Sequence, residues 1–343
     1  MSLSYLINQS SKFIWYSAHY IISFKYATPI KIDKSNPPPF YGKMPSGKKL
    51  FFEMMKLLNE ERKLINSKFY KIPKTELKDL INTAKGSFDF FLDLPKIDKR
   101  RTSGKFSEVK TNKDLPKYFL RNFHHQTDGY LSDFSASIYD LQVEILFNGS
   151  ADSMRRRIIK PIKEGLEIFR DRKKSSIKIL DVATGSGRTL KQLRAAFPRE
   201  KITGIDLSDS YLKEASRYIS DLDGDLIQLI KGNAEELPFE NDSFQCISCV
   251  YLFHELPRTI RAKVLNEFFR VLEPGGILVL ADSIQISDSP DFTSVMESFY
   301  KSFHEPFYCD YIKEDIDSKI QEVGFKDVKS NSFFMTKVWS AVK

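Results

Sequence analysis

The sequence predicts an α/β protein built on a seven-stranded, mostly parallel sheet with an antiparallel edge hairpin, preceded by a mainly helical N-terminal region. From Ile177 onward, short apolar runs alternate with helical stretches of about 10–15 residues, a pattern typical of strands joined by helices. Such alternation with short links predicts parallel strands covered by helices on both faces. Only Met335 and Thr336 separate the final two runs, which indicates a hairpin.

The N-terminal region carries helical periodicity between two loop-like stretches. Met1–Tyr26 is aromatic-rich but interrupted by polar residues, so we expect a partly buried helix, with a helix lying on a membrane surface as the alternative. Asp33–Ser46, with three consecutive prolines, and the polar, basic Lys96–Pro116 are expected to be linkers or surface loops. Apolar residues at helical spacing predict further helices over Gly47–Ser67, Lys74–Thr83, Ala136–Phe147 and Ala151–Phe169.

The remaining elements define the second part of the chain. The expected strands are Ile177–Val182, Lys201–Ile205, Leu226–Ile230, Phe244–Tyr251, Gly276–Ala281, Val328–Phe334 and Lys337–Val342. The expected helices are Arg188–Phe197, Ser208–Ser220, Thr259–Val271 and a broken stretch from Thr293 to Val323. We therefore divide the chain into a helical region, residues 1–150, that covers a site or binds substrate, and a sheet domain, residues 151–343.

Composition narrows the function classes. The chain has 343 residues and a net charge of +8, of which residues 1–170 carry +12 and residues 171–343 carry −4. A basic half suits an anionic substrate, a membrane surface or nucleic acid, but its basic residues are scattered, which favours an ordinary solvated surface. No run of about 18 apolar residues or secretory signal occurs, so we expect a cytoplasmic protein, with peripheral membrane contact as an alternative.

Cysteine usage indicates a reducing compartment, because three cysteines in so long a chain do not form a disulfide framework. Cys246 and Cys249 have the spacing of a redox or metal motif. They lie within an expected strand, however, where residues three apart point to opposite faces. We therefore interpret both as small core residues.

The turn after the first strand reads Asp181-Val-Ala-Thr-Gly185-Ser-Gly187. Two glycines between a strand and a helix allow a ligand to approach the backbone closely. A dinucleotide fingerprint requires a small residue three positions after the second glycine, where this chain has Leu190. A carboxylate at Asp181 would also repel a pyrophosphate, so the turn does not favour NAD.

The next three strand ends carry further polar residues. Asp206 ends the second strand, where a carboxylate can accept hydrogen bonds from both hydroxyls of a ribose. Capping of the following helix is the alternative role for Asp206, although Ser208 is better placed for it. Asn233 follows the third strand and can pair with an adenine edge. Tyr251-Leu-Phe-His254-Glu255 follows the fourth.

Together these motifs resemble the class I S-adenosylmethionine-dependent methyltransferases, in particular the subgroup that includes the quinone-ring methyltransferases. The D-x-x-x-G-x-G turn, I-D-L-S, G-N-A-E-E-L-P-F and Arg270-Val-Leu-Glu-Pro-Gly-Gly appear in the expected order from Ile177 to Lys343, about half of the chain. The resemblance implies a Rossmann-like fold, S-adenosylmethionine as cofactor and methyl transfer to a small molecule. The cofactor-binding residues that it implies are Asp181, Ala183, Gly185, Gly187, Asp206, Leu207, Asn233, Ala234 and Tyr251.

Two positions depart from the family pattern. Ala183 stands where a glycine is common, and Asn233 stands where an aspartate is usual. Alanine is a modest change, and an asparagine carbonyl can still accept a hydrogen bond from the adenine amine.

Upstream residues are candidates for binding the methyl acceptor. Asn122–Tyr130 gathers two of the five histidines with other polar and aromatic groups on an expected loop, and relatives often have a Tyr-Asp pair near Tyr139. We therefore expect His124, His125, Tyr130 and Tyr139 to contact the acceptor, with a polar surface turn as the alternative. A metal site formed by His124, His125 and Asp128 has no established ligand spacing, so no metal is expected.

His254 is the candidate general base, because it follows the fourth strand and its ordinary pKa suits proton abstraction. A structural histidine is the alternative, and Glu255 and His124 are the next candidates. The aromatic N-terminal region suits an apolar or lipid-like acceptor. Methylation of RNA or protein, and a non-catalytic cofactor-binding subunit, remain alternatives, although no nucleic-acid-binding module is apparent. The sequence leaves the oligomeric state open.

Overall fold

The computed structural model describes residues 2–26, 44–72, 77–103, 109–111, 114–220, 222 and 227–343. Most of the expected loop Asp33–Ser46, the first residues of Lys74–Thr83, the centre of Lys96–Pro116 and Leu226 lie outside these residues. Within the described part, the strands form one seven-stranded sheet in the order β3-β2-β1-β4-β5-β7-β6.

The sheet confirms the predicted α/β fold. β1 to β5 pair in parallel, whereas β7 lies antiparallel between β5 and β6, so the edge hairpin is also confirmed. β5 begins earlier than expected, because Leu272 already pairs with Phe244 on β4. The strands are β1 Lys178–Val182, β2 Lys201–Asp206, β3 Ile227–Lys231, β4 Phe244–Val250, β5 Leu272–Ser283, β6 Lys326–Phe333 and β7 Thr336–Val342.

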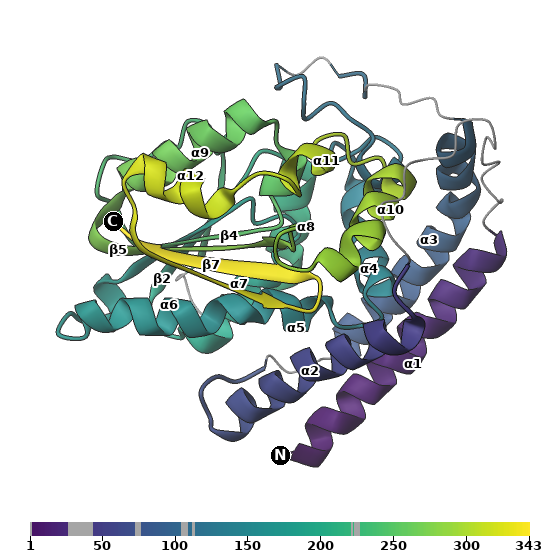
Figure 1. Ribbon diagram of the computed structural model, residues 1–343, viewed down its shortest axis with the longest axis horizontal. Coiled ribbons are helices and arrows are strands. Elements are labelled where there is room, and N and C mark those ends of the chain that lie inside the picture. Colours follow the sequence, from purple (N-terminus) through teal and green to yellow (C-terminus); the bar gives the residue numbers. More distant parts are fainter. Residues whose placement is uncertain are drawn as a thin grey trace.

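Helices cover both faces of the sheet, as the alternation of elements predicted. Figure 1 shows α9 (Arg258–Val271) and α12 (Ile316–Val323) on one side, and α6 (Ile159–Gly165) and α7 (Arg188–Ala196) on the other. Cys249 packs in the first layer and Cys246 in the second, so the two thiols lie on opposite faces of β4. α8 (Asp209–Ile219) packs beside α7 and begins at Ser208, whose hydroxyl accepts the Tyr211 N–H and caps the helix.

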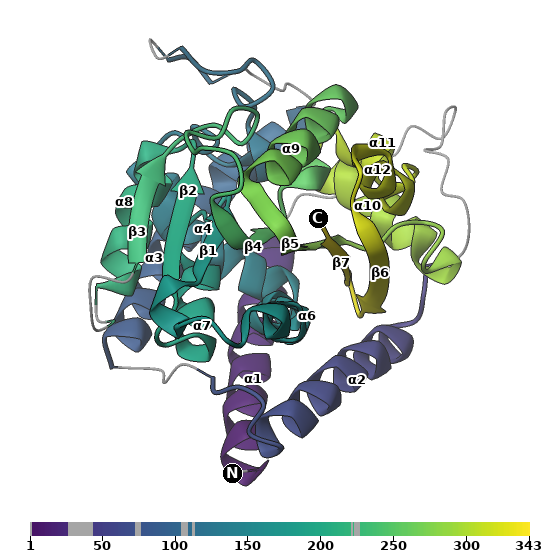
Figure 2. The ribbon, with the colours of Figure 1, turned by 90° about the vertical axis from the view of Figure 1, so that its left-hand side faces the viewer.

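The N-terminal helices are α1 (Ser2–Tyr26), α2 (Gly47–Asn66), α3 (Leu77–Ser103) and α4 (Asp133–Leu146). α1 and α2 form a V beneath the sheet (Figure 2). α1 is partly buried as expected, since Tyr5, Tyr16 and His19 are buried while its outer face is apolar and exposed. Among the described helices, none combines the length and the hydrophobicity needed to span a bilayer.

α3 corrects two expectations, because it continues well past Thr83 and makes Lys96–Ser103 helical instead of part of a loop. Pro95 lies inside this helix, where a proline normally costs about 3 kcal/mol. Burial of Phe90 and Leu94 against α4 offsets that cost. The end of α3 is also anchored, because Arg100 Nε donates to the carbonyl of His125 over 2.7 Å.

The helical stretch Ala151–Phe169 is broken into α5 (Ala151–Arg155), α6 and short 3₁₀ turns. A buried ion pair joins it to α2, with Glu61 Oε1 2.5 Å from Arg156 Nε and Glu61 Oε2 3.0 Å from a terminal nitrogen of the same guanidinium. Ser153 and Tyr5 also donate to Glu61, over 2.6 and 2.7 Å. Removing one partner from such a pair is strongly destabilising, so this network fixes α1 and α2 to the sheet domain.

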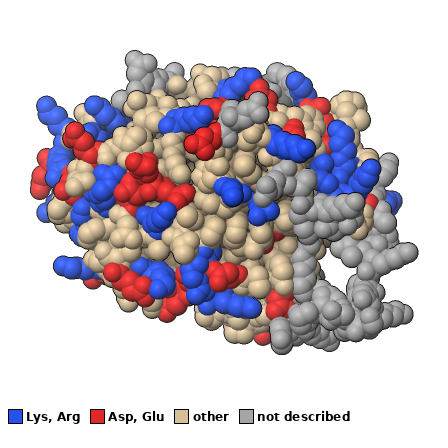
Figure 3. Space-filling model, turned by 90° about the horizontal axis from the view of Figure 1, so that it is seen from above, with Lys and Arg blue, Asp and Glu red and all other residues tan. Residues whose placement is uncertain are grey.

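On the face drawn in Figure 3, basic and acidic side chains are interspersed. Opposite charges also pair directly on the surface, as in Arg258 with Asp310 and Lys319 with Glu322. This arrangement agrees with a solvated surface for the part of the protein seen in that view.

Candidate active site

A pocket lies at the carboxyl ends of β1, β2, β3 and β4, where a doubly wound sheet binds its ligands. Its empty space, open mouth included, is about 1060 Å³. Its floor comes from the loops after these strands, and its cover comes from residues 118–140 of the helical region. The expected cofactor residues that line it are Ala183, Gly185, Asp206, Leu207, Asn233, Ala234 and Tyr251.

The turn after β1 is held in a conformation that favours glycine. Ala183, Gly185 and Gly187 have φ values of +56°, +54° and +84°. At Gly185 an added Cβ would meet only the Tyr211 ring, 4.0 Å away, so the backbone there borders open space. At Gly187 an added Cβ would lie 3.1 Å from Ala215, which shows that this glycine allows α7 to pack on α8 and does not line the pocket.

Asp181 lies beneath this turn and not on the pocket wall. Its carboxylate accepts hydrogen bonds from Thr184 Oγ1 and Ser248 Oγ, both over 2.6 Å. Burial raises the pKa of Asp181 to about 6, and the nearby charge of Asp206 acts in the same direction. Asp181 therefore positions the turn through Thr184.

Asp206 lies at the pocket surface. Its Oδ2 accepts the Gly185 N–H over 2.8 Å, and its Oδ1 accepts the Ser208 N–H over 2.9 Å. Burial raises the pKa of Asp206, although the backbone donors oppose that shift. Asn233 also lines the pocket, but its Oδ1 accepts the Glu235 N–H over 3.0 Å, so the side-chain carbonyl shapes its own loop.

Aromatic rings form a further part of the pocket wall. Tyr130, Tyr139 and Tyr211 meet edge to face, with centroids 5.3 to 5.9 Å apart, and Phe123 stacks on Tyr130. Two of these rings, Tyr130 and Tyr139, are expected substrate residues, whereas Tyr211 was not foreseen. His125 does not line the pocket, because the ring packs against His304 at 5.7 Å.

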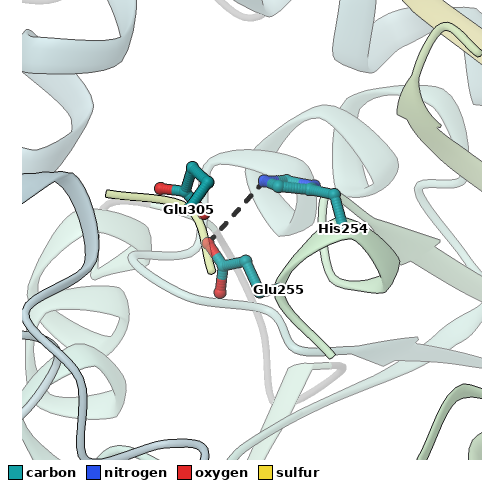
Figure 4. Close-up of side chains that lie close together, drawn as sticks. All are labelled: His254, Glu255 and Glu305. Atoms are coloured by element: carbon teal, nitrogen blue, oxygen red, sulfur yellow. Dashed lines mark ion pairs between the residues drawn. The ribbon is translucent and has the colours of Figure 1, made fainter. Parts of the chain in front are cut away.

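A group of histidines and carboxyls lies behind that wall, and we call His124, His254, Glu255, Asp282 and Glu305 the acid–imidazole cluster. Figure 4 shows His254, Glu255 and Glu305 converging. His254 Nδ1 is 2.6 Å from Asp282 Oδ1, and His124 Nδ1 is 3.1 Å from Glu305 Oε1. Glu255 lines the pocket and accepts a hydrogen bond from the Tyr130 hydroxyl, so it connects the cluster with the pocket.

The protonation equilibria of the cluster are strongly perturbed. Burial lowers the pKa of His254, but Asp282 outweighs burial and the pKa rises to about 9. Burial and the positive charge of His254 lower the pKa of His124 to about 3. Burial raises the pKa of Glu255, and burial together with the charge of Glu255 holds the pKa of Glu305 well above its usual value.

The loop that carries His124 is strained. His124, His125 and Asp128 have φ values of +54°, +55° and +62°, a region that residues other than glycine rarely adopt. Such strain persists only where the surrounding structure enforces it, and it concentrates at functional sites. Gly129 follows at φ +53°, where a Cβ would lie 2.3 Å from the Arg121 carbonyl oxygen.

Asp282 and Glu305 were not foreseen from the sequence. Asp282 lies next to last in β5, as Asp181 does in β1, and Asp206 is the last residue of β2, so an acid near the strand end was a signal in the sequence. Glu305 follows α10 (Thr293–Phe303) and nothing local distinguishes it. Among the described residues, one group has ligand atoms close enough together for a metal ion, within 4.8 Å of one another: His254, Glu255 and Glu305. Asp128, which belongs to the metal site considered from the sequence, is exposed.

Comparisons with known proteins agree with this geometry. Residues 179–276 match the family model described as a methyltransferase domain. Demethylmenaquinone methyltransferase from Thermotoga maritima is 33% identical over 177 residues, which cover 52% of this chain and 70% of that protein. The enzyme of the same name from Listeria monocytogenes is 30% identical over 144 residues, which cover 42% of this chain and 59% of that protein.

Solved structures give lower similarity. A SAM-dependent methyltransferase from Aquifex aeolicus has a TM-score of 0.37 and 18% identity, covering 53% of this chain and 90% of that chain. Phosphoethanolamine N-methyltransferase 2 from Haemonchus contortus, in complex with S-adenosyl-L-methionine, has a TM-score of 0.41 and 16% identity, covering 53% of this chain and 52% of that chain.

Proposed function

Because this chain belongs to the class I S-adenosylmethionine-dependent methyltransferases, we propose that it transfers the methyl group of this cofactor to an apolar, small-molecule acceptor. One observation carries the proposal: a single pocket is lined by Asp206 and the glycine turn together with a group of aromatic rings and Glu255. The curated relatives, which are named for a quinone-type small molecule, support an acceptor of that size.

The residues of the pocket floor fit the cofactor. Backbone N–H groups donate to both Asp206 oxygens, and a carboxylate oxygen can accept a further donor, such as a ribose hydroxyl. Leu207 and Ala234 offer apolar surface to an adenine, and Tyr251 begins the wall on the methyl-donor side. The open space above Gly185 leaves room for the amino-acid portion.

The bound cofactor supplies a methyl group already activated by a sulfonium charge, so the protein contributes alignment and exclusion of water. The aromatic wall excludes water from the acceptor end. Glu255, the next candidate base, lines the pocket and is placed to act on the proton of an acceptor hydroxyl or acidic carbon. His254 lies behind the pocket wall, and its pairing with Asp282 raises its pKa to about 9, which disfavours it as a base near neutral pH.

The helical region, residues 1–150, forms the lid of this site in our proposal. It supplies Phe119, Phe123, Tyr130 and Tyr139 to the pocket wall, and the buried pair of Glu61 and Arg156 holds part of it to the sheet domain. The exposed apolar residues Ile7, Ile14 and Ile21 of α1 support contact with a membrane from which a lipid-like acceptor could be drawn. Co-sedimentation with phosphatidylcholine vesicles tests this contact, which is excluded if wild type and an Ile14→Ser, Ile21→Ser variant sediment alike.

Calorimetric titration with S-adenosylmethionine, S-adenosylhomocysteine and NADH tests the cofactor assignment. We expect the two sulfur ligands to bind and NADH not to bind. Asp206→Ala should weaken binding by about 100-fold, because charge-assisted hydrogen bonds are lost. Asp209→Ala is the matched control, since this neighbouring acid is exposed and pairs with Lys231. Absence of binding by the wild-type protein would contradict the proposed function.

A further inference from the structure

Three side chains of the acid–imidazole cluster converge on one point beside the pocket. His254 and Glu255 belong to the short turn after β4, whereas Glu305 follows α10 in a distant part of the chain. One ligand atom from each lies within 4.8 Å of the other two, and Figure 4 shows the three side chains converging. An imidazole and two carboxylates form a donor set that suits a divalent transition-metal ion such as Zn²⁺.

The imidazole of His254 is held in the orientation that a metal ligand requires. Its Nδ1 donates to Asp282 Oδ1 over 2.6 Å, so Nε2 is the nitrogen that an ion would take, in place of the second ring proton. Asp282 is itself fixed, because its two oxygens accept the Phe253 N–H over 2.8 Å and the Ser283 N–H over 2.7 Å. A carboxylate behind the ring is the usual support of a metal-binding histidine.

Glu305 provides an independent observation that points to a ligand. Its side chain is completely inaccessible to solvent, and its Oε1 lies 3.1 Å from His124 Nδ1. Its Oε2 is buried and has no hydrogen-bond partner among the described residues. Because an unpaired buried oxygen is unfavourable, this carboxyl needs a further partner, which an ion at the convergence point would provide.

We infer that His254 Nε2, Glu255 and Glu305 bind one divalent transition-metal ion, and that Zn²⁺ is the ion their donor set favours. The ion joins the turn after β4 to the segment after α10. Asp282 is a positioning residue that acts on the ion through His254. No metal was expected from the sequence, because only the fold brings Glu305 to the other two ligands.

The spacing of the site requires side-chain movements alone. Ligands about 2.1 Å from one tetrahedral ion lie about 3.4 Å apart, so separations of at most 4.8 Å must close by up to about 1.4 Å. The terminal torsions of the two glutamates are broad, which allows this closure without movement of the backbone. The Tyr130 hydroxyl donates to Glu255 Oε1, and a carboxylate has lone pairs for both this bond and an ion.

The site is reached through the pocket. Glu255 lines the pocket, whereas His254 and Glu305 do not, so an ion enters past Glu255. An ion on Glu255 occupies a lone pair that would otherwise accept a proton. A filled site and proton transfer by Glu255 therefore exclude each other, and the ion inhibits any step that uses this base. This last consequence alone rests on the proposed function.

The test is calorimetric titration of the full-length protein, first freed of metal with a chelator and dialysed, with ZnCl₂, MnCl₂ and MgCl₂. We expect one Zn²⁺ per chain with micromolar or stronger affinity, weaker binding of Mn²⁺ and the weakest binding of Mg²⁺. Glu305→Gln should weaken Zn²⁺ binding at least about 100-fold, because a charged ligand is lost. Glu255→Gln is the second ligand variant, with the same expected loss, and carries the test if Glu305→Gln does not fold.

Asp282→Asn tests the positioning role. The amide oxygen still accepts the Nδ1 hydrogen of His254, but the charge behind the ring is lost, so Zn²⁺ binding should weaken about tenfold. The visible absorption of Co²⁺ bound in place of Zn²⁺ should shift in this variant. His19→Gln, at a buried histidine of α1 bonded to Ser87, is the control and should bind Zn²⁺ as the wild type does. Circular dichroism checks the fold of each variant.

Three outcomes overturn the inference. They are absence of Zn²⁺ binding by the wild-type protein, unchanged Zn²⁺ affinity in a folded Glu305→Gln or Glu255→Gln variant, and loss of binding in folded His19→Gln. S-adenosylmethionine is titrated separately. If Zn²⁺ fails to bind while S-adenosylmethionine binds, only this inference falls. If Zn²⁺ binds and S-adenosylmethionine does not, only the proposed function falls.

Discussion

The two ends of the pocket are built in different ways. At the cofactor end, consecutive short loops after β1, β2 and β3 supply backbone N–H groups and Asp206, and both oxygens of that carboxylate have backbone donors. At the acceptor end, side chains come from distant segments, and His124 Nε2 is buried without a hydrogen bond in the part of the chain that the structure describes. The Asp206 carboxylate is therefore fixed by the backbone before a ligand arrives, whereas His124 Nε2 is not fixed by any hydrogen bond among the described residues.

The two ends also differ in the features that lower the stability of the folded state, namely backbone strain and buried ionisable groups. At the cofactor end, two residues other than glycine have positive φ, Ala183 in the β1 turn and Tyr251 after β4, and Asp181 is bonded to Thr184 beneath the turn. The acceptor loop accumulates strain at three residues other than glycine and buries ionisable groups near one another. We therefore expect the acceptor end to react more strongly to substitution, and the predictions below test that contrast.

Gly129→Ala should give the largest effect. A Cβ at this position would lie 2.3 Å from the Arg121 carbonyl oxygen, at φ +53°, so the covering loop must move. We expect destabilisation of about 3 kcal/mol or more, measured by urea denaturation. The affinity for S-adenosylmethionine should change much less, because the β1 and β2 loops do not depend on this contact.

Gly86→Ala is the matched control for the same substitution. Gly86 lies within α3, with no positive φ and a nearest contact of 3.7 Å, so alanine should stabilise the helix by about 0.5–1 kcal/mol. Equal changes in the two variants would mean that the acceptor loop is not sterically constrained.

The same contrast explains how far the sequence could predict the site. Asp206, Gly185 and Leu207 were found because they lie in short local motifs at strand ends, and these line the pocket. Glu305 was missed because it reaches the cluster through a left-handed turn at His304, which no local pattern announces. The sequence places His125 next to His124, so both were expected at the same site. Both residues have positive φ, and their rings point in different directions, that of His125 toward His304.

The fold was predicted more completely than the site. Short apolar runs alternating with helical stretches were sufficient to predict all seven strands, since each strand shows the same simple pattern. α3 was the main exception, because Pro95 and the basic residues after it resemble a loop. Tertiary burial of Phe90 and Leu94 outweighs these local preferences, and the sequence alone does not reveal that contact.

Asp181→Asn should reveal a pH dependence that belongs to the cofactor end. Because the folded-state pKa of Asp181, about 6, exceeds its unfolded value of 3.8, the native state holds the proton more tightly. Wild-type stability should therefore fall as the pH rises, by about 2 kcal/mol between pH 4 and pH 6 and by about 3 kcal/mol in total above pH 7, relative to the variant. Denaturation at several pH values measures the difference, and a gap that stays constant with pH would show that Asp181 is not buried as an acid.

Gly185→Ala should separate stability from binding. The φ of +54° predicts a cost of about 1 kcal/mol, but the new methyl group meets no atom closer than 4.0 Å. Since that methyl group points into the open space of the pocket, we expect the affinity for S-adenosylmethionine to fall at least about tenfold. Unchanged affinity by calorimetry would place the cofactor away from this turn.

Ala183→Gly is the reciprocal change two residues away and should have the smallest effect. Ala183 has φ +56°, so glycine removes strain of about 1 kcal/mol while adding freedom to the unfolded chain that costs about 0.4–1 kcal/mol. The two contributions nearly cancel, and we expect a net change within about 0.5 kcal/mol by urea denaturation. Cofactor affinity should be kept, because the backbone of the turn does not move. A stabilisation well above 1 kcal/mol would mean that the cofactor end stores more strain than its hydrogen bonds indicate, and the contrast between the two ends would then be smaller than we infer.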